Sequence, residues 1–307
     1  MTEKLVIATR QSPLALRQSE MVRDRLMLCH PGLEVTLLPL STRGDEVLDR
    51  SLAAIGGKGL FIKELEIALA QGRADIAVHS MKDLPAQMPE AFIIGAVLAR
   101  SEPRDAFVSA RLPEIGSLRP GHRVGTSSLR RQAQLLERFP GVEVVALRGN
   151  VGTRLGKLDD GMFDAAILAA AGLDRLGLGG RIRQRLAPAQ MLPAVGQGAI
   201  GIELRAGDDV VLERVAVLQD EMTACCVAAE RAMSGQLGGS CQLPLAGHAT
   251  IVQGRLHLRA LIAMPDGGKV LRAEQQGEPE DAEMVGRAVA ADLMAQGGGA
   301  ILESLVS

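Results

Sequence analysis

Short apolar, β-branched runs alternate with longer segments of helical spacing along the first two thirds of the chain. Strands are predicted at residues 5–9, 34–40, 75–79, 92–98, 123–125, 143–147, 165–169 and 199–204. Helices are predicted at residues 13–29, 59–71, 128–139, 151–160 and 223–235. Such alternation is typical of mainly parallel sheets joined by crossover helices and predicts an α/β fold.

The pattern changes after Glu221. Residues 242–277 predict two or three antiparallel strands, with a turn at 265–268 between strands 256–263 and 269–274, and a helix follows over 279–295. This indicates a small α+β domain at the C-terminus. Proline-containing segments at 100–104 and 188–195 are predicted hinges between two preceding α/β domains.

Composition narrows the class of protein. At 307 residues the chain has room for two or three domains. It has no Trp or Tyr and five Phe, which argues against binding single-stranded nucleic acid on aromatic platforms. No signal-peptide pattern and no long apolar run is found, so we expect neither secretion nor a membrane span.

The four cysteines are Cys29, Cys225, Cys226 and Cys241, with no CxxC spacing, and the five histidines are scattered. We therefore expect no disulfide framework, no metal site and reduced thiols in the cytoplasm.

The net charge of −2 conceals a basic block. Residues 100–190 hold 14 Arg and one Lys against nine acidic residues, a net +6, so the rest of the chain carries −8. A local basic excess indicates an anionic ligand, but a solvated charged face explains the count equally well.

Basic and hydroxyl residues cluster after predicted strands, where ligands of parallel sheets bind. These residues are Arg10 and Ser12, Ser80 and Lys82, Thr126, Ser128, Arg130 and Arg131, and Arg148 and Arg154. Helix N-termini with hydroxyls and forked guanidinium groups suit carboxylates or phosphates. A single such arginine is ordinarily a surface ion pair, whereas four clusters at successive strand ends favour ligand binding.

Asp83 follows one of these strands beside Lys82. A carboxylate there is suited to move a proton or to stabilise a developing cation. Capping a helix, or pairing with Lys82, are the simpler interpretations.

Two glycine-containing segments are candidates for a functional role. Residues 56–59 (GGKG) lack the Lys-Ser/Thr ending of a phosphate loop, so we interpret 43–58 as a lid or an ordinary surface loop. Cys241 lies between glycines and Pro244 in a tight loop. Such a setting suits a reactive thiol or an inert one, while Cys225 and Cys226 are predicted to be buried on a helix.

Read in order, the motifs closely resemble those of the porphobilinogen deaminase family, and they span residues 7–242. The matching segments are 7–16 (IATRQSPLAL), 42–45 (TRGD), 56–61 (GGKGLF), 77–85 (AVHSMKDLP), 125–131 (GTSSLRR), 147–154 (LRGNVGTR), 192–198 (LPAVGQG) and 240–242 (SCQ). One of these motifs would be weak evidence, but the ordered set is specific.

The resemblance implies an enzyme that joins four porphobilinogen molecules head to tail into hydroxymethylbilane and releases ammonia, in tetrapyrrole biosynthesis. It implies a dipyrromethane cofactor held by a thioether to Cys241, and Asp83 as the catalytic residue. The implied binders of cofactor and substrate carboxylates are Arg10, Ser12, Lys58, Ser80, Lys82, Thr126, Ser128, Arg130, Arg131, Arg148, Arg154, Arg175 and Gln197.

The family fold implied is two periplasmic-binding-protein-like domains of type II with mixed sheets, plus a small C-terminal α+β domain. We expect domain 1 at residues 1–99 with 199–217, domain 2 at 104–193, and domain 3 at 221–307. The resemblance also implies a cytoplasmic monomer that binds neither nucleic acid nor membrane and passes its product to uroporphyrinogen-III synthase.

The sequence departs from the family pattern at two places. Ala54 stands where some relatives have a second lysine, which puts a role for that lysine in doubt but leaves Lys58 unaffected. The cysteine loop reads Gly-Gly-Ser-Cys where Glu-Gly-Gly-Cys is common, and both are loops of small residues, so we expect attachment at Cys241 to survive.

Three competing functions remain on the residues alone. A periplasmic solute-binding protein would need a signal peptide and no Cys241 loop. A cysteine hydrolase would need a histidine base, and only His248 is near Cys241 in sequence. A carboxylate-binding regulator would bind its ligand without consuming it.

Overall fold

The computed structural model describes residues 3–42, 62–239 and 243–305. The chain divides into two compact units, and the first is built from two separate stretches. Unit 1 comprises Met1–Ser101 and Ala199–Ala224, and unit 2 comprises Glu102–Gly198 and Cys225–Ser307. Within the described residues, every helix is too short or too polar to cross a membrane.

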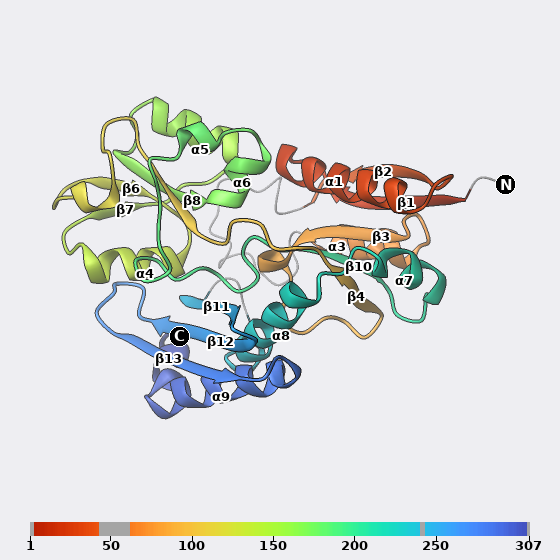
Figure 1. Cartoon of the computed structure of the whole chain (residues 1–307). Helices are drawn as coiled ribbons and strands as arrows, with labels where there is room; N and C mark the ends of the chain where they lie inside the picture. Colours follow the sequence, from red (N-terminus) through yellow and green to blue (C-terminus); the bar gives the residue numbers. More distant parts are fainter. Residues whose placement is uncertain (1–2, 43–61, 240–242, 306–307) are drawn as a thin grey trace. The chain divides into compact units, whose positions relative to one another are not determined.

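Unit 1 is built on a mixed five-stranded sheet of order β2-β1-β3-β10-β4 (Figure 1). β1 (Lys4–Arg10), β2 (Glu34–Leu40) and β3 (Ile76–Ser80) are parallel. β10 (Ile200–Arg205) enters from much later in the sequence and runs antiparallel to both β3 and β4 (Phe92–Val97).

Helices cover both faces of this sheet because side chains alternate along each strand. Leu5 and Ile7 of β1 belong to one apolar cluster with α1 (Pro13–Cys29) and α7 (Asp209–Ala216). Ala8 belongs to the opposite cluster with α3 (Lys63–Ala70).

Unit 2 contains a second mixed five-stranded sheet, of order β7-β6-β8-β5-β9. β6 (Arg123–Gly125), β7 (Glu143–Val145) and β8 (Ala165–Ala169) are parallel; β5 (Asp105–Val108) and β9 (Gln184–Arg185) are antiparallel additions. α4 (Leu129–Arg138) packs on one face. α5 (Val151–Asp159) and α6 (Ala170–Arg175) pack on the other. Short 3₁₀ turns occupy Ile115–Ser117 and Gly179–Arg181.

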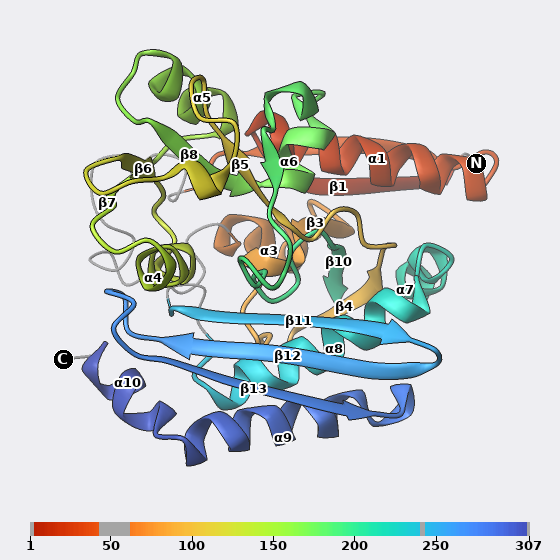
Figure 2. The same cartoon turned by 60° about the vertical axis from the view of Figure 1, so that its left-hand side comes forward.

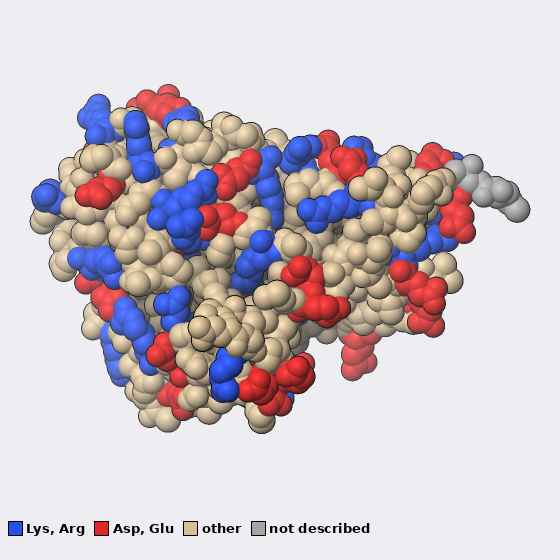
Figure 3. Space-filling view, in the orientation of Figure 1, with Lys and Arg blue, Asp and Glu red and all other residues tan. Residues whose placement is uncertain are grey.

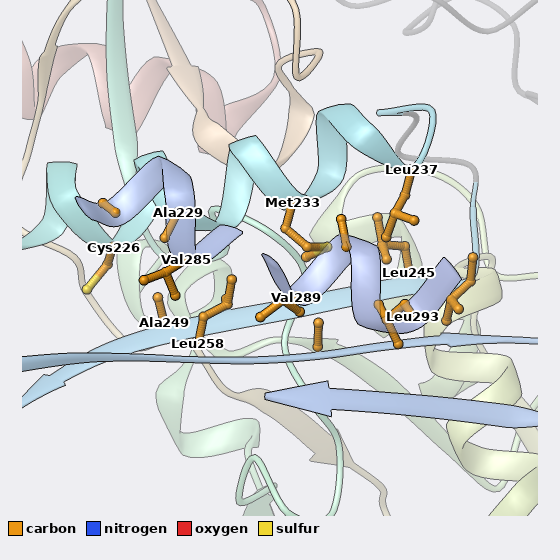
Figure 4. Packing of buried hydrophobic residues seen from close by; sticks show 14 of the residues in the cluster. Cys226, Ala229, Met233, Leu237, Leu245, Ala249, Leu258, Val285, Val289 and Leu293 are labelled. Atoms are coloured by element: carbon orange, nitrogen blue, oxygen red, sulfur yellow. The ribbon is translucent and has the colours of Figure 1, made fainter. Parts of the chain in front are cut away.

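A three-stranded antiparallel sheet completes unit 2, made of β11 (Leu245–Val252), β12 (Arg255–Ala263) and β13 (Val270–Gly277) (Figure 2). One face packs on α8 (Glu221–Gln236) and α9 (Ala282–Ala295), which meet across Ala229, Met233, Val285 and Val289 (Figure 4). A 3₁₀ turn at Pro279–Asp281 precedes α9, and α10 (Gly298–Ser304) ends the described chain.

The predicted fold class, two mixed α/β sheets and a small C-terminal α+β part, is confirmed. All eight strands predicted before Glu221 are present within a few residues, as are the turn at 265–268 and the final helix. β5, β9, α6, α7 and α10 were not predicted. The division into three domains stays a prediction, and the small C-terminal sheet lies within unit 2.

Candidate functional site

The carboxyl edge of the sheet in unit 1 gathers the first group of predicted site residues. β1 ends at Arg10, and Ser12 follows as the N-cap of α1, where its Oγ accepts from the Ala15 N–H at 3.4 Å. The neighbouring strand β3 ends at Ser80. Because β1 and β3 are parallel neighbours, Arg10, Ser12 and Ser80 lie along one sheet edge, as predicted.

Asp83 closes a single 3₁₀ turn, Met81–Asp83, that follows β3. Met81 is buried and its N–H donates to the Ala199 carbonyl at 3.0 Å, while Asp83 is exposed. Gly201 of β10 makes room for Met81, since a Cβ there would lie 2.2 Å from the Met81 sulfur. The N-cap of the turn is Ser80, so Asp83 lies within the turn and does not occupy the cap position.

A buried acid–imidazole pair lies behind this turn, and it was not predicted. His79 Nε2 lies 2.8 Å from Glu203 Oε2, and both side chains are almost fully enclosed. Glu203 Oε1 has no hydrogen-bond partner among the described residues. The pKa of Glu66 is raised, first by burial and second by the negative charge of Glu203.

The second group of site residues lies at the carboxyl edge of the sheet in unit 2, where the parallel strands β6, β7 and β8 each lead into a helix. Ser128 caps α4 by accepting from the Arg131 N–H at 3.5 Å, and Thr126 Oγ1 accepts from the Ser128 N–H at 3.2 Å. Ser127 Oγ donates to the Leu147 carbonyl at 3.1 Å, which joins the loops after β6 and β7.

Arg130 and Arg131 are buried and share one carboxylate, that of Asp105 in β5. Arg130 Nη1 donates to Asp105 Oδ2 at 2.8 Å, and Arg131 Nη2 donates to Oδ1 at 2.8 Å. Burial alone would raise the pKa of Asp105, but the two guanidinium groups hold it well below its usual range. Two cations and one anion leave this cluster with a net charge of +1 at the start of α4.

Gln197 is also part of this cluster. Its Nε2 donates to Asp105 Oδ1 at 2.9 Å and to the Pro103 carbonyl at 2.7 Å, so it ties the chain just after the predicted hinge 188–195 to the predicted hinge 100–104. Its Oε1 is buried with no hydrogen-bond partner among the described residues. Arg175, at the end of α6, donates to the Gly198 carbonyl at 2.7 Å, and burial lowers its pKa to about 10.

The loop after β7 places Arg148 and Arg154 at the start of α5. Asn150 is the N-cap and accepts from the Thr153 N–H at 2.9 Å. Arg154 Nε donates to the Gly149 carbonyl at 2.7 Å, and Lys157 Nζ donates to the Arg148 carbonyl at 3.3 Å. Gly149 adopts φ +106, and a Cβ on it would lie 2.8 Å from Thr153, so glycine is required at this turn.

Other arginines of the basic block are surface ion pairs. Arg185 pairs with Asp174 at 2.8 Å, and Arg104 pairs with Glu102 at 2.6 Å. Lysine and arginine side chains stand among acidic ones on the face drawn in Figure 3. The solvated-face interpretation is therefore correct for Arg104 and Arg185, and the anionic-ligand interpretation stays a prediction for the others.

Two predicted site residues, Lys58 and Cys241, lie outside the described residues, as does the whole of the predicted lid 43–58. No group of three or more His, Cys, Asp or Glu side chains able to hold a metal occurs in the stretches 3–42, 62–239 and 243–305.

Glu230 of α8 is a buried carboxylate that sequence reasoning missed. Its Oε2 accepts from the Gly196 N–H at 2.6 Å and its Oε1 from the Ala249 N–H at 2.7 Å. His248 Nδ1 lies 3.7 Å from the same Oε1. Glu230 thus ties α8 both to β11 and to the segment that carries Gln197. The neighbouring residues of the helix did not predict its burial, because a single Glu on a helix ordinarily faces water.

Comparison with known proteins covers nearly the whole chain. Residues 5–213 match the family model for the porphobilinogen deaminase dipyromethane cofactor binding domain, and residues 224–295 match the model for the porphobilinogen deaminase C-terminal domain. The chain is 54% identical to the porphobilinogen deaminase of Thiobacillus denitrificans over 301 residues, covering 98% of each chain. It is also 54% identical to that of Bordetella parapertussis, covering 99% of this chain and 97% of the relative.

Two solved structures are distant likenesses of the chain. The BvgS VFT2 domain of Bordetella pertussis is 16% identical with a TM-score of 0.42, covering 69% of this chain and 85% of that one. The methionine binding protein MetQ is 14% identical with a TM-score of 0.43, covering 70% and 89%. The assignment therefore comes from the sequence matches: the chain belongs to the porphobilinogen deaminase family.

Proposed function

We propose that this chain joins four porphobilinogen molecules head to tail into hydroxymethylbilane, releasing ammonia, with Asp83 as its catalytic residue and Cys241 as the anchor of its dipyrromethane. Family membership supports the reaction and the cofactor. The residue roles are supported by where the described side chains lie.

The observation that carries the proposal is the carboxyl edge of the sheet in unit 2. Three parallel strands deliver three helix starts there; Ser128 and Arg148 lie at the first two, and Arg175 lies at the end of the short third helix. The buried cluster of Arg130, Arg131 and Asp105 adds a net positive charge behind them. A pyrrole chain that bears an acetate and a propionate on every ring needs such a set of fixed cations and N–H donors.

The same donor set fits a dipyrromethane, which carries four carboxylates. Buried cations are costly unless they meet anions, so the excess charge at the start of α4 favours a carboxylate ligand. When bound, the dipyrromethane supplies the nucleophilic pyrrole carbon from which the chain grows. Arg130 and Arg131 contribute mainly through their charge, because Asp105 and backbone carbonyls already take several of their donors.

Asp83 has the exposure and the support that a catalytic carboxylate needs. The buried Met81 anchors this turn against β10, so the backbone that carries Asp83 is held beyond the sheet edge. As an ion it accepts a hydrogen bond from a substrate pyrrole N–H that gains positive charge; as an acid it gives a proton to the departing amine. Arg10, Ser12, Ser80 and Lys82 bind substrate carboxylates beside it.

Intact-mass measurement of the purified chain tests the proposal. We expect two pyrrole units above the sequence mass, absent in Cys241→Ala and retained in Cys29→Ala, which removes an exposed thiol elsewhere. Incubation with porphobilinogen should then give hydroxymethylbilane and ammonia. A chain of bare sequence mass that binds porphobilinogen unchanged would instead indicate a solute-binding protein or a regulator. Product formation that survives Cys241→Ala would exclude the anchor role.

The remaining expectations also belong to this proposal. They are a monomer in the cytoplasm, no binding of nucleic acid, and transfer of the product to uroporphyrinogen-III synthase. Light scattering of the pure protein, and a coupled assay with that synthase, test the first and the last.

A further inference from the structure

The turn between β12 and β13 is a compact tip closed by hydrogen bonds of its own. The Met264 N–H donates to the Lys269 carbonyl at 2.8 Å, and the Gly267 N–H donates to the Met264 carbonyl at 2.9 Å. Asp266 Oδ1 accepts from the Gly268 N–H at 2.9 Å. Gly267 takes φ +74, a left-handed conformation.

Gly267 presses against the backbone of α4. A Cβ built on it would lie 2.4 Å from the Glu137 nitrogen and 2.8 Å from the Ala133 oxygen. Those two atoms belong to one turn of the helix, so no side chain can rotate aside to relieve the overlap. Only the hydrogen of a glycine fits between this tip and α4.

The tip is the outer edge of a wider contact between the small sheet and α4. Ala133 packs in one buried cluster with Ala246 of β11 and with Leu261 and Ala263 of β12. At the rim, Arg272 of β13 pairs with Glu137 of α4. Because the sheet meets α4 through a close-packed apolar cluster and, at Gly267, through bare backbone, the separation between them is closely defined.

The other end of α4 carries predicted site residues. Ser128 caps the helix, and Arg130 and Arg131 hold it to Asp105 of β5. Gly267 touches the same helix one to two turns later. Adding one carbon at Gly267 forces a shift of roughly 1 Å, since carbon contacts are comfortable only near 3.5 Å. Whether α4 or the small sheet yields, the distance between them changes.

We propose that Gly267 is a positioning residue that sets the distance between the small sheet and the carboxylate-binding start of α4. This inference rests on the proposed function. The small sheet thus sets where α4 lies, and with it the position of Ser128, Arg130 and Arg131, to which the proposed function assigns the carboxylates of the ligand.

A pair of matched variants of the full chain tests this inference. Gly254, in the turn between β11 and β12, has φ +79 and open space where a Cβ would be. Asn tolerates left-handed angles, so Gly267→Asn and Gly254→Asn carry similar backbone strain and differ in the contact with α4. We expect Gly267→Asn to load dipyrromethane at least tenfold more slowly and to raise the KM for porphobilinogen at least fivefold. Gly254→Asn should behave as the parent chain.

The loading rate and the KM distinguish a positioning role of Gly267 from a role in packing alone. If Gly267→Asn lowers the Tm but leaves loading rate and KM at the values of Gly254→Asn, the contact is only structural and the inference is wrong. If Gly267→Asn does not fold, the pair Gly267→Ala and Gly254→Ala gives the same comparison with a smaller side chain.

Hydrogen exchange keeps this inference separate from the proposed function. If the parent chain neither loads the cofactor nor makes product, the proposed function fails by itself. Exchange of the first-turn amides of α4, residues 129–132, should still be faster in Gly267→Asn than in Gly254→Asn. Equal exchange rates in the two variants would overturn the positioning role.

Discussion

Asp105 and Arg131 are joined through two nitrogen atoms of one guanidinium group, with Nε at 3.1 Å and Nη2 at 2.8 Å from the same carboxylate oxygen. The carboxylate is fully buried, and its second oxygen serves Arg130. One aspartate in β5 therefore fixes two consecutive arginines at the start of α4.

Asp105→Asn should lower the free energy of unfolding by about 3–5 kcal/mol, because it leaves two buried cations without their counter-ion. Urea unfolding of parent and variant measures the difference. Asp174→Asn is the matched control, since it removes the exposed carboxylate that pairs with Arg185 and should cost about 0–1 kcal/mol. Equal losses in the two variants would show that the buried cluster contributes no more than a surface pair.

The contribution of Asp105 should also depend on pH in one direction. The folded-state pKa of Asp105 is well below its usual range, despite burial, because of Arg130 and Arg131. Its stabilisation is therefore complete above the unfolded pKa, about 3.9, and is lost as the pH falls toward the folded value. The difference in unfolding free energy between parent and Asp105→Asn should be constant from pH 7 to about pH 5 and should shrink below about pH 4. A difference that grows on acidification would contradict this assignment.

Asp83→Asn should keep the dipyrromethane mass and lower kcat by about 10²–10⁴-fold, because the amide neither accepts a proton nor carries charge. Asp83 is exposed in its turn, so the Tm should change little. Steady-state kinetics on protein whose cofactor content has been measured by mass gives the answer. Full turnover in a loaded Asp83→Asn enzyme would remove Asp83 from the chemistry.

Glu230→Gln should lower the free energy of unfolding by about 1–3 kcal/mol. The carboxylate accepts two backbone N–H groups in a buried site, and an amide of the same shape leaves at least one of them facing an NH₂ group. Thermal or urea unfolding measures the loss. Glu283→Gln on α9, whose carboxylate meets Arg287 on the surface, should change stability by less than about 0.5 kcal/mol.

The sequence predicted the strands of the two five-stranded sheets well because helices cover both faces of each, so that their strands are runs of apolar residues. It also predicted that site residues gather at strand ends, since that follows from parallel topology alone. Arg10, Ser12 and Ser80 in unit 1, and Ser128 and Arg148 in unit 2, lie where this rule puts them.

Partners that lie far apart in sequence could not be predicted. Asp105 meets Arg130 and Arg131 across 25 or more positions, and Glu230 reaches Gly196 across 34. The residues next to each acid in the sequence do not indicate that it is buried. Asp105 is the first residue of a short strand, and Glu230 lies within a helix. The roles of the individual site residues, Lys58 and Cys241 included, stay predictions.

The position of β10 has a consequence for how the protein is made. This strand lies in the middle of the sheet in unit 1, between β3 and β4, yet it comes from residues 200–205. During synthesis, the edges of β3 and β4 that later pair with β10 stay unpaired while about a hundred further residues emerge from the ribosome. The N-terminal portion of a nascent chain is thus exposed to unwanted strand pairing until late in translation, and truncation before residue 205 should yield an insoluble product.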